Sequence, residues 1–333
     1  MLDIPCSQRP SRLEFHDLSP DLGDFRRELI AGLSARHKSI PCRFLYDARG
    51  SALFDRICKL PEYYPTRTEF GILRQIAPEV AERVGPGAQM IELGGVNSLK
   101  ARILLDALDQ PAAYIPIDIS RDHLRASAEA IHAEKPGLSV LAVCADYTQP
   151  FDLPYAPGGG MRLGFFPGST IGNLQPDEAI GFLAAWVNKL GPGAAMIVGV
   201  DLRKSPAILE PAYDDALGVT ADFSRNLLAR ANRELGADFE IGAFAHRARY
   251  DIPSGRIVIN LESLQDQTVT VPSDDGPVEI PFAQGERIHT EDSYKYSVEG
   301  FRALARAAGF RPTAVWTDKD QLFSIHYLET AAG

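Results

Sequence analysis

The feature that most constrains the fold is an alternation between short apolar runs and amphipathic helical patterns over residues 66–200. Residues 66–84 place apolar side chains on one helical face, at Phe70, Leu73, Ile76 and Val80. A second helical pattern covers 176–190, and apolar runs of strand length lie at 89–93, 114–119, 138–144, 162–166 and 194–200. This rhythm is typical of an α/β fold built on a largely parallel sheet.

The rhythm changes after residue 204 and returns near the end of the chain. A helical pattern at 221–235 precedes alternating strands, among them 256–261 and 268–271, with turn signals between them. A helix at 297–308 and a strand pair at 313–316 and 322–327 then follow. A parallel sheet that ends in a helix and an antiparallel pair resembles the class I methyltransferase sheet more than the sheet of dinucleotide dehydrogenases.

We therefore predict an α/β fold whose first domain has a Rossmann-like class I sheet, over residues 62–204 and 289–333. Residues 10–61 and 205–288 are predicted to form a second, smaller α+β lobe that binds substrate. A fold alone does not establish a reaction, so the function has to come from particular residues.

Charge and composition argue against several classes of protein. The formal net charge of −10 disfavours nucleic acid as a partner. No stretch approaches the roughly 20 apolar residues of a membrane helix, and residues 1–20 lack signal-peptide character, so we expect a cytoplasmic protein without membrane association. Neither a disulfide framework nor a metal site is predicted, because no ligand spacing occurs among the seven histidines or the cysteines Cys6, Cys42, Cys58 and Cys144.

A glycine turn follows the first predicted strand, in the stretch Glu92-Leu93-Gly94-Gly95-Val96-Asn97-Ser98. Glycine lets the backbone approach a ligand closely, and this position is where doubly wound sheets bind nucleotides. An ordinary tight turn between a strand and a helix explains the same residues, so the turn alone leaves both interpretations open.

Two aspartates end the next predicted strands. Asp118 lies 24 residues after Gly94, about where such sheets place an acid that accepts hydrogen bonds from ribose hydroxyls. Asp146 ends the third strand, where a carboxylate can accept from an adenine amino group. A helix N-cap is the alternative for Asp118, and the spacing suits a nicotinamide cofactor equally well.

Several long local strings resemble the L-histidine Nα-methyltransferase family of ergothioneine biosynthesis. They are Tyr46-Asp47 with Gly50-Ser51, residues 60–69, residues 168–174 and residues 212–220. The similarity runs from about Tyr46 to the C-terminus. It implies S-adenosylmethionine as the methyl donor, a free amino acid as the small-molecule substrate, three successive methylations of one amine, and a two-lobed monomer.

The resemblance also implies roles for particular residues. The donor-binding residues correspond to Tyr46, Gly94, Lys100, Asp118, Asp146 and Tyr147. The residues that bind the amino-acid backbone correspond to Tyr63, Gly168, Asn173 and Tyr213, and those that bind the imidazole correspond to Glu291 and Ser293. Catalytic roles fall to Tyr46, which is expected to orient the amine, and to Asn173 and Tyr213.

These residue types suit methyl transfer, which mainly requires donor and amine to be aligned in a dry site. A tyrosine hydroxyl and a chain of waters can pass the proton of the amine outward. Each candidate also has a structural interpretation: Tyr63 and Tyr213 as packing aromatics, Glu291 and Ser293 as helix caps, and Lys100 as a solvated cation.

The chain departs from the family pattern at three positions. Gly95-Val96-Asn97 stands where the family carries a serine-glycine pair, so either Gly95 adopts a special conformation or donor binding weakens. Tyr147 replaces a phenylalanine, and Ile259 stands where a methionine is usual. The alternatives are therefore a methyltransferase of another amino acid or histidine derivative, a non-catalytic amino-acid-binding relative and, least favoured, a nicotinamide oxidoreductase.

Overall fold

The computed structural model divides the chain into two compact units. It describes residues 11–20, 23–94, 99–154, 156 and 159–332. Unit 1 comprises Met1–Leu22, Arg67–Leu202 and Tyr296–Gly333, and unit 2 comprises Gly23–Thr66 and Arg203–Lys295. Within the described residues, no helix is long and apolar enough to cross a membrane.

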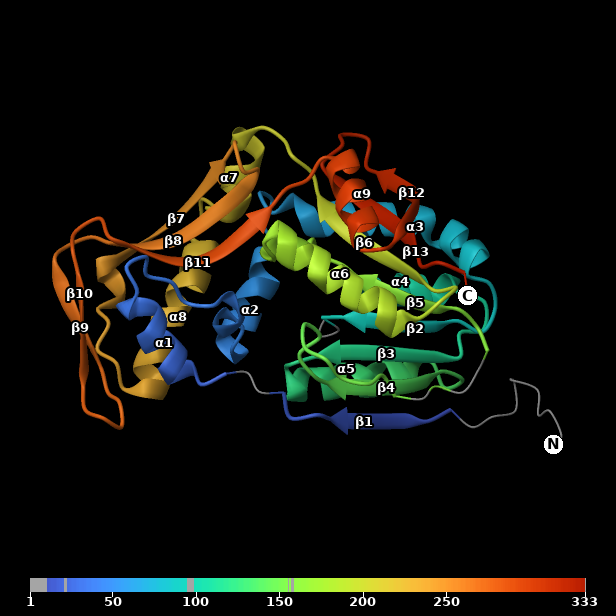
Figure 1. Ribbon diagram of the computed structural model, residues 1–333, viewed down its shortest axis with the longest axis horizontal. Helices are drawn as coiled ribbons and strands as arrows, with labels where there is room; N and C mark the ends of the chain where they lie inside the picture. Colours follow the sequence, from blue (N-terminus) through green and yellow to red (C-terminus); the bar gives the residue numbers. More distant parts are fainter. Residues whose placement is uncertain (1–10, 21–22, 95–98, 155, 157–158, 333) are drawn as a thin grey trace. The chain divides into compact units, whose positions relative to one another are not determined.

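Unit 1 is built on an eight-stranded mixed sheet in the order β1-β4-β3-β2-β5-β6-β13-β12 (Figure 1). The six strands from β1 to β6 pair in parallel, and β13 pairs antiparallel with both β6 and β12. The bounds are β1 Leu13–Asp17, β2 Gln89–Leu93, β3 Ala113–Asp118, β4 Ser139–Cys144, β5 Arg162–Phe166, β6 Ala195–Asp201, β12 Arg311–Thr317 and β13 Phe323–Glu329. The antiparallel insertion of β13 confirms the expected class I sheet.

Helices cover both faces of this sheet. In Figure 1 the helices α6 (Pro176–Leu190) and α9 (Val298–Ala307) lie in front of it, and α3, α4 and α5 lie behind it. The bounds of these rear helices are Tyr64–Val84, Leu99–Ala107 and Arg121–Glu134. Their buried apolar faces form one cluster with the strands. With helices on both faces of the sheet, β2, β3 and β4 are buried along their whole length.

Unit 2 combines an antiparallel sheet with short helices. The strands β7 (Phe244–Asp251), β8 (Arg256–Ser263) and β11 (Arg287–Tyr294) form a sheet in the order β11-β8-β7. A separate pair consists of β9 (Gln267–Val271) and β10 (Val278–Phe282). The helical segments are α1 Phe25–Ser34, η2 Cys42–Leu45, α2 Ala48–Ile57, α7 Pro206–Tyr213, α8 Val219–Leu235 and η4 Ile241–Ala243.

The unit boundaries differ from the predicted domain boundaries at four places. Residues 62–66, which include Tyr63, and residues 203–204 were expected in the sheet domain and belong to unit 2.

The other two differences each move a strand. Residues 13–17, expected in the substrate lobe, form β1 and pair with β4 of unit 1. Residues 289–294, expected in the sheet domain, belong to β11 and pair with β8 of unit 2. β1 pairs with a strand that is far away in the sequence, and the register of β11 shifts between His289 and Glu291. Local sequence patterns encode neither feature.

A glycine in β6 leaves room for a buried carboxylate. A Cβ at Gly199 would lie 2.1 Å from Oε1 of Glu69, which is carried by α3, and 3.2 Å from Phe323. Glu69 is fully buried, and its carboxylate accepts hydrogen bonds from Lys100 and from the backbone of Gly168. The carboxylate therefore has no space into which it can retreat from a larger residue at position 199.

We predict that Gly199→Ala lowers the free energy of unfolding by about 1–3 kcal/mol, because it overpacks a rigid, charged contact. Gly181→Ala is the matched control: Gly181 is exposed on α6, and an added Cβ there contacts nothing within 4 Å. Alanine should stabilise the helix at that position by about 0.5–1 kcal/mol. Urea unfolding of both variants measures the two effects, and equal stabilities would contradict the role given to Gly199.

Candidate functional site

The carboxyl ends of neighbouring parallel strands bring the predicted nucleotide-binding residues of unit 1 to one edge of the sheet. Gly94 follows β2 with φ +81°, and its N–H donates to the carbonyl of Ile117 at 2.9 Å. Asp118 ends β3 and Asp146 follows β4. A Cβ at Gly94 would meet no atom of the described residues within 4 Å. Residues Gly95 to Ser98, including Val96, lie outside the described residues.

The carboxyl groups at this edge differ in their surroundings. Burial raises the pKa of Asp118 to about 6, although its Oδ1 accepts a hydrogen bond from the N–H of Ser120 at 2.7 Å. Asp146 is half-buried, and its Oδ1 accepts from the N–H and the hydroxyl of Thr148 at 2.9 and 2.6 Å. The next residue, Tyr147, packs its ring edge-on against Phe166, with 5.7 Å between the ring centroids.

Glu92, at the end of β2, is a fully buried acid beneath this edge. Burial raises its pKa to about 8, against the hydrogen bond that the Tyr114 hydroxyl donates to its carboxylate. The charge of Lys100 also lowers this pKa, whereas Asp118 raises it. The edge thus collects several acids whose charges depend on one another.

Lys100 is an ion-paired residue rather than a solvated cation. Its Nζ lies 2.5 Å from Oε2 of Glu69, and their side chains are 16% and 1% exposed. Both oxygens of the same carboxylate accept the N–H of Gly168, at 2.9 and 3.0 Å. Glu69 was not among the predicted site residues, yet it joins two that were, Lys100 and Gly168.

Two consecutive residues of the loop after β5 adopt left-handed backbone conformations. Gly168 has φ +80° and Ser169 has φ +58°. This conformation is uncommon for a residue with a side chain, and the buried Ser169 hydroxyl stabilises it by accepting the N–H of Asp201 at 2.9 Å. The loop then forms the 3-10 helix η3 (Thr170–Asn173), which holds the predicted residue Asn173.

Unit 2 contains the other predicted residues, and three of its side chains form a triangle. The hydroxyl oxygens of Tyr213 and Ser293 lie 3.1 Å apart. Nζ of Lys295 donates to both, at 2.6 Å to Tyr213 and 2.7 Å to Ser293. The backbone of Tyr213 is also held, because Nε2 of the buried His246 lies 2.7 Å from its carbonyl oxygen.

Tyr63 and Glu291 lie close to this triangle. Burial raises the pKa of Tyr63 well above its ordinary value, and the nearby groups Tyr213, Tyr46 and Glu291 raise it further. The rings of Tyr63 and Tyr213 meet edge-on at 6.0 Å. Of the five predicted residues of unit 2, Tyr46, Tyr213 and Glu291 thus raise the pKa of Tyr63 directly. The remaining one, Ser293, contacts Tyr213.

Neither Glu291 nor Ser293 caps a helix, so that alternative is wrong. Both lie on β11, and the N-cap of α9 is Ser297, whose side chain accepts the N–H of Gly300. In the register of the sheet, Glu291 pairs with Ile259 of β8. Directly opposite residues share a face of a sheet, so Ile259 lies beside Glu291. Ile259 is the residue that stands where the family usually carries a methionine.

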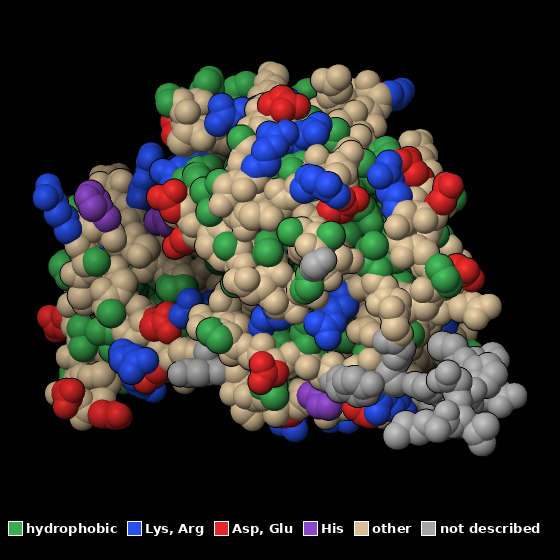
Figure 2. Space-filling view, turned by 45° about the vertical axis from the view of Figure 1, so that its right-hand side comes forward, with side chains coloured by type: hydrophobic (Ala, Val, Ile, Leu, Met, Phe, Trp, Pro, Cys, Tyr) green, Lys and Arg blue, Asp and Glu red, His purple; other side chains and the backbone are tan. Residues whose placement is uncertain are grey.

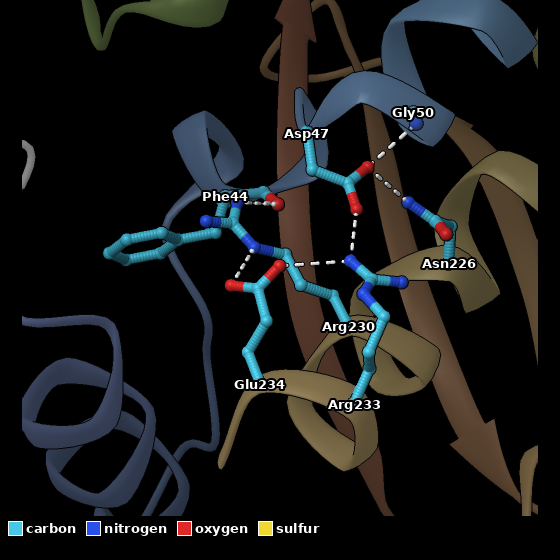
Figure 3. Close-up of polar contacts among 7 residues, drawn as sticks. All are labelled: Phe44, Asp47, Gly50, Asn226, Arg230, Arg233 and Glu234. Atoms are coloured by element: carbon cyan, nitrogen blue, oxygen red, sulfur yellow. Dashed lines mark hydrogen bonds and ion pairs between the residues drawn. The ribbon is translucent and has the colours of Figure 1, made fainter.

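Asp47, the residue after Tyr46, is held by contacts with α2 and α8 (Figure 3). The Asp47 carboxylate caps α2 by accepting the N–H of Gly50 at 2.7 Å, and it also accepts from Asn226 and Arg233 of α8 at 2.7 and 2.5 Å. Burial alone would raise the pKa of Asp47, but these hydrogen bonds hold it below its ordinary value. The Tyr46 ring packs against Phe54 and Phe223, at 5.8 and 5.4 Å between centroids.

The cysteines show no sign of reactivity. Burial raises the pKa of the Cys42 thiol to about 12, and the charge of Glu291 contributes to the rise. Among the described residues, Cys42, Cys58 and Cys144 form no disulfide, while Cys6 lies outside the described residues. Among the residues that the structure describes, no cluster of three or more His, Cys, Asp or Glu side chains is arranged to hold a metal ion.

Sequence reasoning missed three residues that hold the predicted ones in place: Glu69, His246 and Lys295. A signal for Lys295 was present, because Glu291, Ser293 and Lys295 recur with the period of two that marks one face of a strand. Glu69 and His246 had no comparable signal, since their partners are distant in sequence.

The sequence model of the family described as "Histidine-specific methyltransferase, SAM-dependent" matches residues 25–330. The histidine N-alpha-methyltransferase of Mycolicibacterium smegmatis is 45% identical over 88% of this chain and 91% of its own length. That of Mycobacterium tuberculosis is 42% identical over 90% and 93%. Ergothioneine biosynthesis protein 1 of Neurospora crassa is 32% identical over 87% of this chain but only 33% of its own length.

The pKa of Glu92 predicts a pH dependence of stability. Between the ordinary pKa of 4.5 and the folded value of about 8, the folded chain retains a proton that the unfolded chain has lost. Stability therefore falls as the pH rises through this window. In Glu92→Gln this loss should be absent, so the variant should gain at least about 1 kcal/mol relative to the native protein between pH 5 and pH 8.5.

Urea unfolding at these two pH values measures the difference. Glu79→Gln provides the matched control, because Glu79 is exposed and its pKa is lowered, which gives it no titration in this window. A constant difference between Glu92→Gln and the native protein at both pH values would refute the prediction.

Proposed function

The chain belongs to the family of histidine-specific, S-adenosylmethionine-dependent methyltransferases, and we propose that it methylates the α-amino group of free L-histidine. Three successive transfers would yield the trimethylated betaine hercynine. The observation that carries the proposal is the polar cluster of unit 2, where Tyr213, Ser293 and Glu291 offer hydroxyl and carboxylate groups to one small polar substrate.

The residues of unit 1 fit S-adenosylmethionine. Gly94 turns the backbone without carrying a side chain, so a ligand can approach the backbone closely. Asp118 suits the ribose hydroxyls and Asp146 the adenine amino group, with the Tyr147 ring beside them, and Lys100 completes the proposed donor site. When bound, S-adenosylmethionine supplies an electrophilic methyl group carried by a sulfonium.

The polar groups of the substrate suit different residues. Tyr63, Tyr213 and Asn173, with the loop at Gly168, are proposed to bind the amino-acid backbone. The Glu291 carboxylate is proposed to accept a hydrogen bond from one imidazole nitrogen, and the Ser293 hydroxyl to serve the other. A site built on such groups rejects side chains that leave them unpaired.

The amine has to lose a proton before it can accept a methyl group, since an ammonium ion has no lone pair. We propose that Tyr46 orients the amine and that its hydroxyl begins the path by which the proton leaves. The clamp of Asp47 on α8 supports this role, because it fixes the backbone next to Tyr46.

A second candidate is methylation of another free amino acid or of a histidine derivative. It is favoured by Ile259, which replaces the family's usual methionine and pairs with Glu291 in the sheet. A branched, stiffer side chain beside the group proposed to bind the imidazole changes the shape available to the substrate.

We further propose a cytoplasmic monomer that does not bind nucleic acid. The net charge of −10 supports the last point. On the face in Figure 2, Lys and Arg side chains lie interspersed with Asp and Glu side chains, in keeping with a solvated surface. Size-exclusion chromatography with light scattering tests the monomer, and a mass of twice 36.4 kDa would contradict it.

Incubation of the purified protein with S-adenosylmethionine and all free amino acids, followed by mass spectrometry, tests the proposed reaction. Histidine is expected to gain three methyl groups, and a reaction without S-adenosylmethionine should leave it unchanged. Methylation of a different amino acid would favour the second candidate. No methylation would refute both and favour a non-catalytic amino-acid-binding relative.

Glu291→Ala is predicted to reduce kcat/KM for histidine by at least about 100-fold, because the imidazole loses a charged hydrogen-bond partner, while donor binding stays within twofold. Glu279→Ala is the control, since Glu279 is an exposed carboxylate on β10 of the same unit. Steady-state kinetics and calorimetric titration of S-adenosylmethionine give both values. Native kcat/KM in Glu291→Ala would contradict the assignment of the imidazole site.

A further inference from the structure

Lys295 has a fully buried side chain, only 1% exposed, although lysine is among the residues least often buried. Its backbone is fixed on both sides. Its N–H donates to the carbonyl of Gly255 at 2.7 Å, and its carbonyl accepts from Nε of Arg203 at 3.1 Å. Burial of a lysine side chain costs conformational entropy. Its burial on a fixed backbone therefore indicates a specific role for the ammonium group.

The position of Lys295 relates it to two residues of the proposed substrate site. Glu291, Ser293 and Lys295 alternate along and just beyond β11. Alternate residues of a strand point to the same face, so the three side chains form a row. Lys295 reaches from this row to Tyr213 of α7, with its Nζ 4.5 Å from the centre of the tyrosine ring.

The ammonium group restricts the hydrogen-bond directions in the triangle of Lys295, Tyr213 and Ser293. An ammonium group is a donor only, so both hydroxyl oxygens accept from Nζ of Lys295, at 2.6 and 2.7 Å. Both hydroxyl hydrogens therefore point away from Nζ. Either hydroxyl can donate across the 3.1 Å contact between them, and when Ser293 does so, the Tyr213 hydrogen points out of the triangle.

We propose that Lys295 is a positioning residue that makes the site selective for substrates with a free carboxylate. Its ammonium group orients both hydroxyls so that Ser293 donates to Tyr213, and the outward Tyr213 hydrogen donates to the substrate carboxylate. Its positive charge is separated from the acceptor by one hydroxyl group, so it favours an anionic acceptor over a neutral one. The inference rests on the proposed function, because the resemblance assigns the amino-acid backbone to Tyr213.

The test compares the binding of L-histidine and L-histidinamide, which differ in the carboxylate alone. Calorimetric titration of the native protein is expected to show at least about tenfold tighter binding of histidine. In Lys295→Met, which keeps the length of the side chain but not its charge, this preference should fall to about twofold or less. The loss corresponds to one charge-assisted hydrogen bond.

Lys204→Met is the matched control. Nζ of Lys204 donates to the Tyr64 hydroxyl at 2.7 Å and lies 4.6 Å from the centre of its ring, so the local geometry is the same. The preference for histidine should be retained in this variant. Thermal unfolding of both variants separates loss of fold from loss of selectivity, and Lys295→Gln serves if Lys295→Met does not fold.

A double-mutant cycle with Tyr213→Phe tests whether Lys295 acts through the tyrosine hydroxyl. Lys295→Met should then weaken histidine binding much less in the Tyr213→Phe background than in the native one. Full additivity, or an unchanged preference for histidine in Lys295→Met, would overturn the proposal. Histidine binding without methylation would refute the proposed reaction alone, whereas methylation with unchanged selectivity in Lys295→Met would refute this inference alone.

Discussion

The buried carboxylate of Glu69 is the interaction on which the sheet unit depends. It connects α3, through its own backbone, to α4 through Lys100 and to the loop after β5 through the N–H of Gly168. Removing one partner of a buried ion pair costs about 3–5 kcal/mol, because the other charge remains in a region of low polarity. Gly199 of β6 has no side chain, and this leaves the space that the Glu69 carboxylate occupies.

The second unit contains a buried charge of the opposite sign. The Lys295 ammonium is buried against the hydroxyls of Tyr213 and Ser293 and orients these neutral groups. The Asp47 carboxylate is held between α2 and α8 by the N–H of Gly50, by Asn226 and by Arg233. Such fixed dipoles are more effective than mobile ones, because no reorganisation is needed when a ligand binds.

The sheet unit also places acids where their protonation depends on burial. The raised pKa values of Glu92 and Asp118 follow from desolvation at the carboxyl ends of β2 and β3. Because these acids influence each other and the nearby Lys100, a cofactor that donates hydrogen bonds to one of them alters the charge on the others. The proposed binding of S-adenosylmethionine at this edge would therefore be coupled to protonation of these acids.

The amino-acid sequence by itself determined the class I sheet, the turn at Gly94 and the family. Apolar runs buried on both faces and the antiparallel pair at the C-terminus are local patterns, and the strings around Tyr46, Gly168 and Tyr213 are long enough to identify relatives. Only the tertiary structure decided that residues 13–17 join the sheet, and that Glu291 and Ser293 lie on a strand and cap no helix. It alone identified Glu69, His246 and Lys295 as supports of the site. The period of two along β11 marks the face that Lys295 shares, but the strand pairing and the partners of Glu69 and His246 are remote along the chain, and no local periodicity records them.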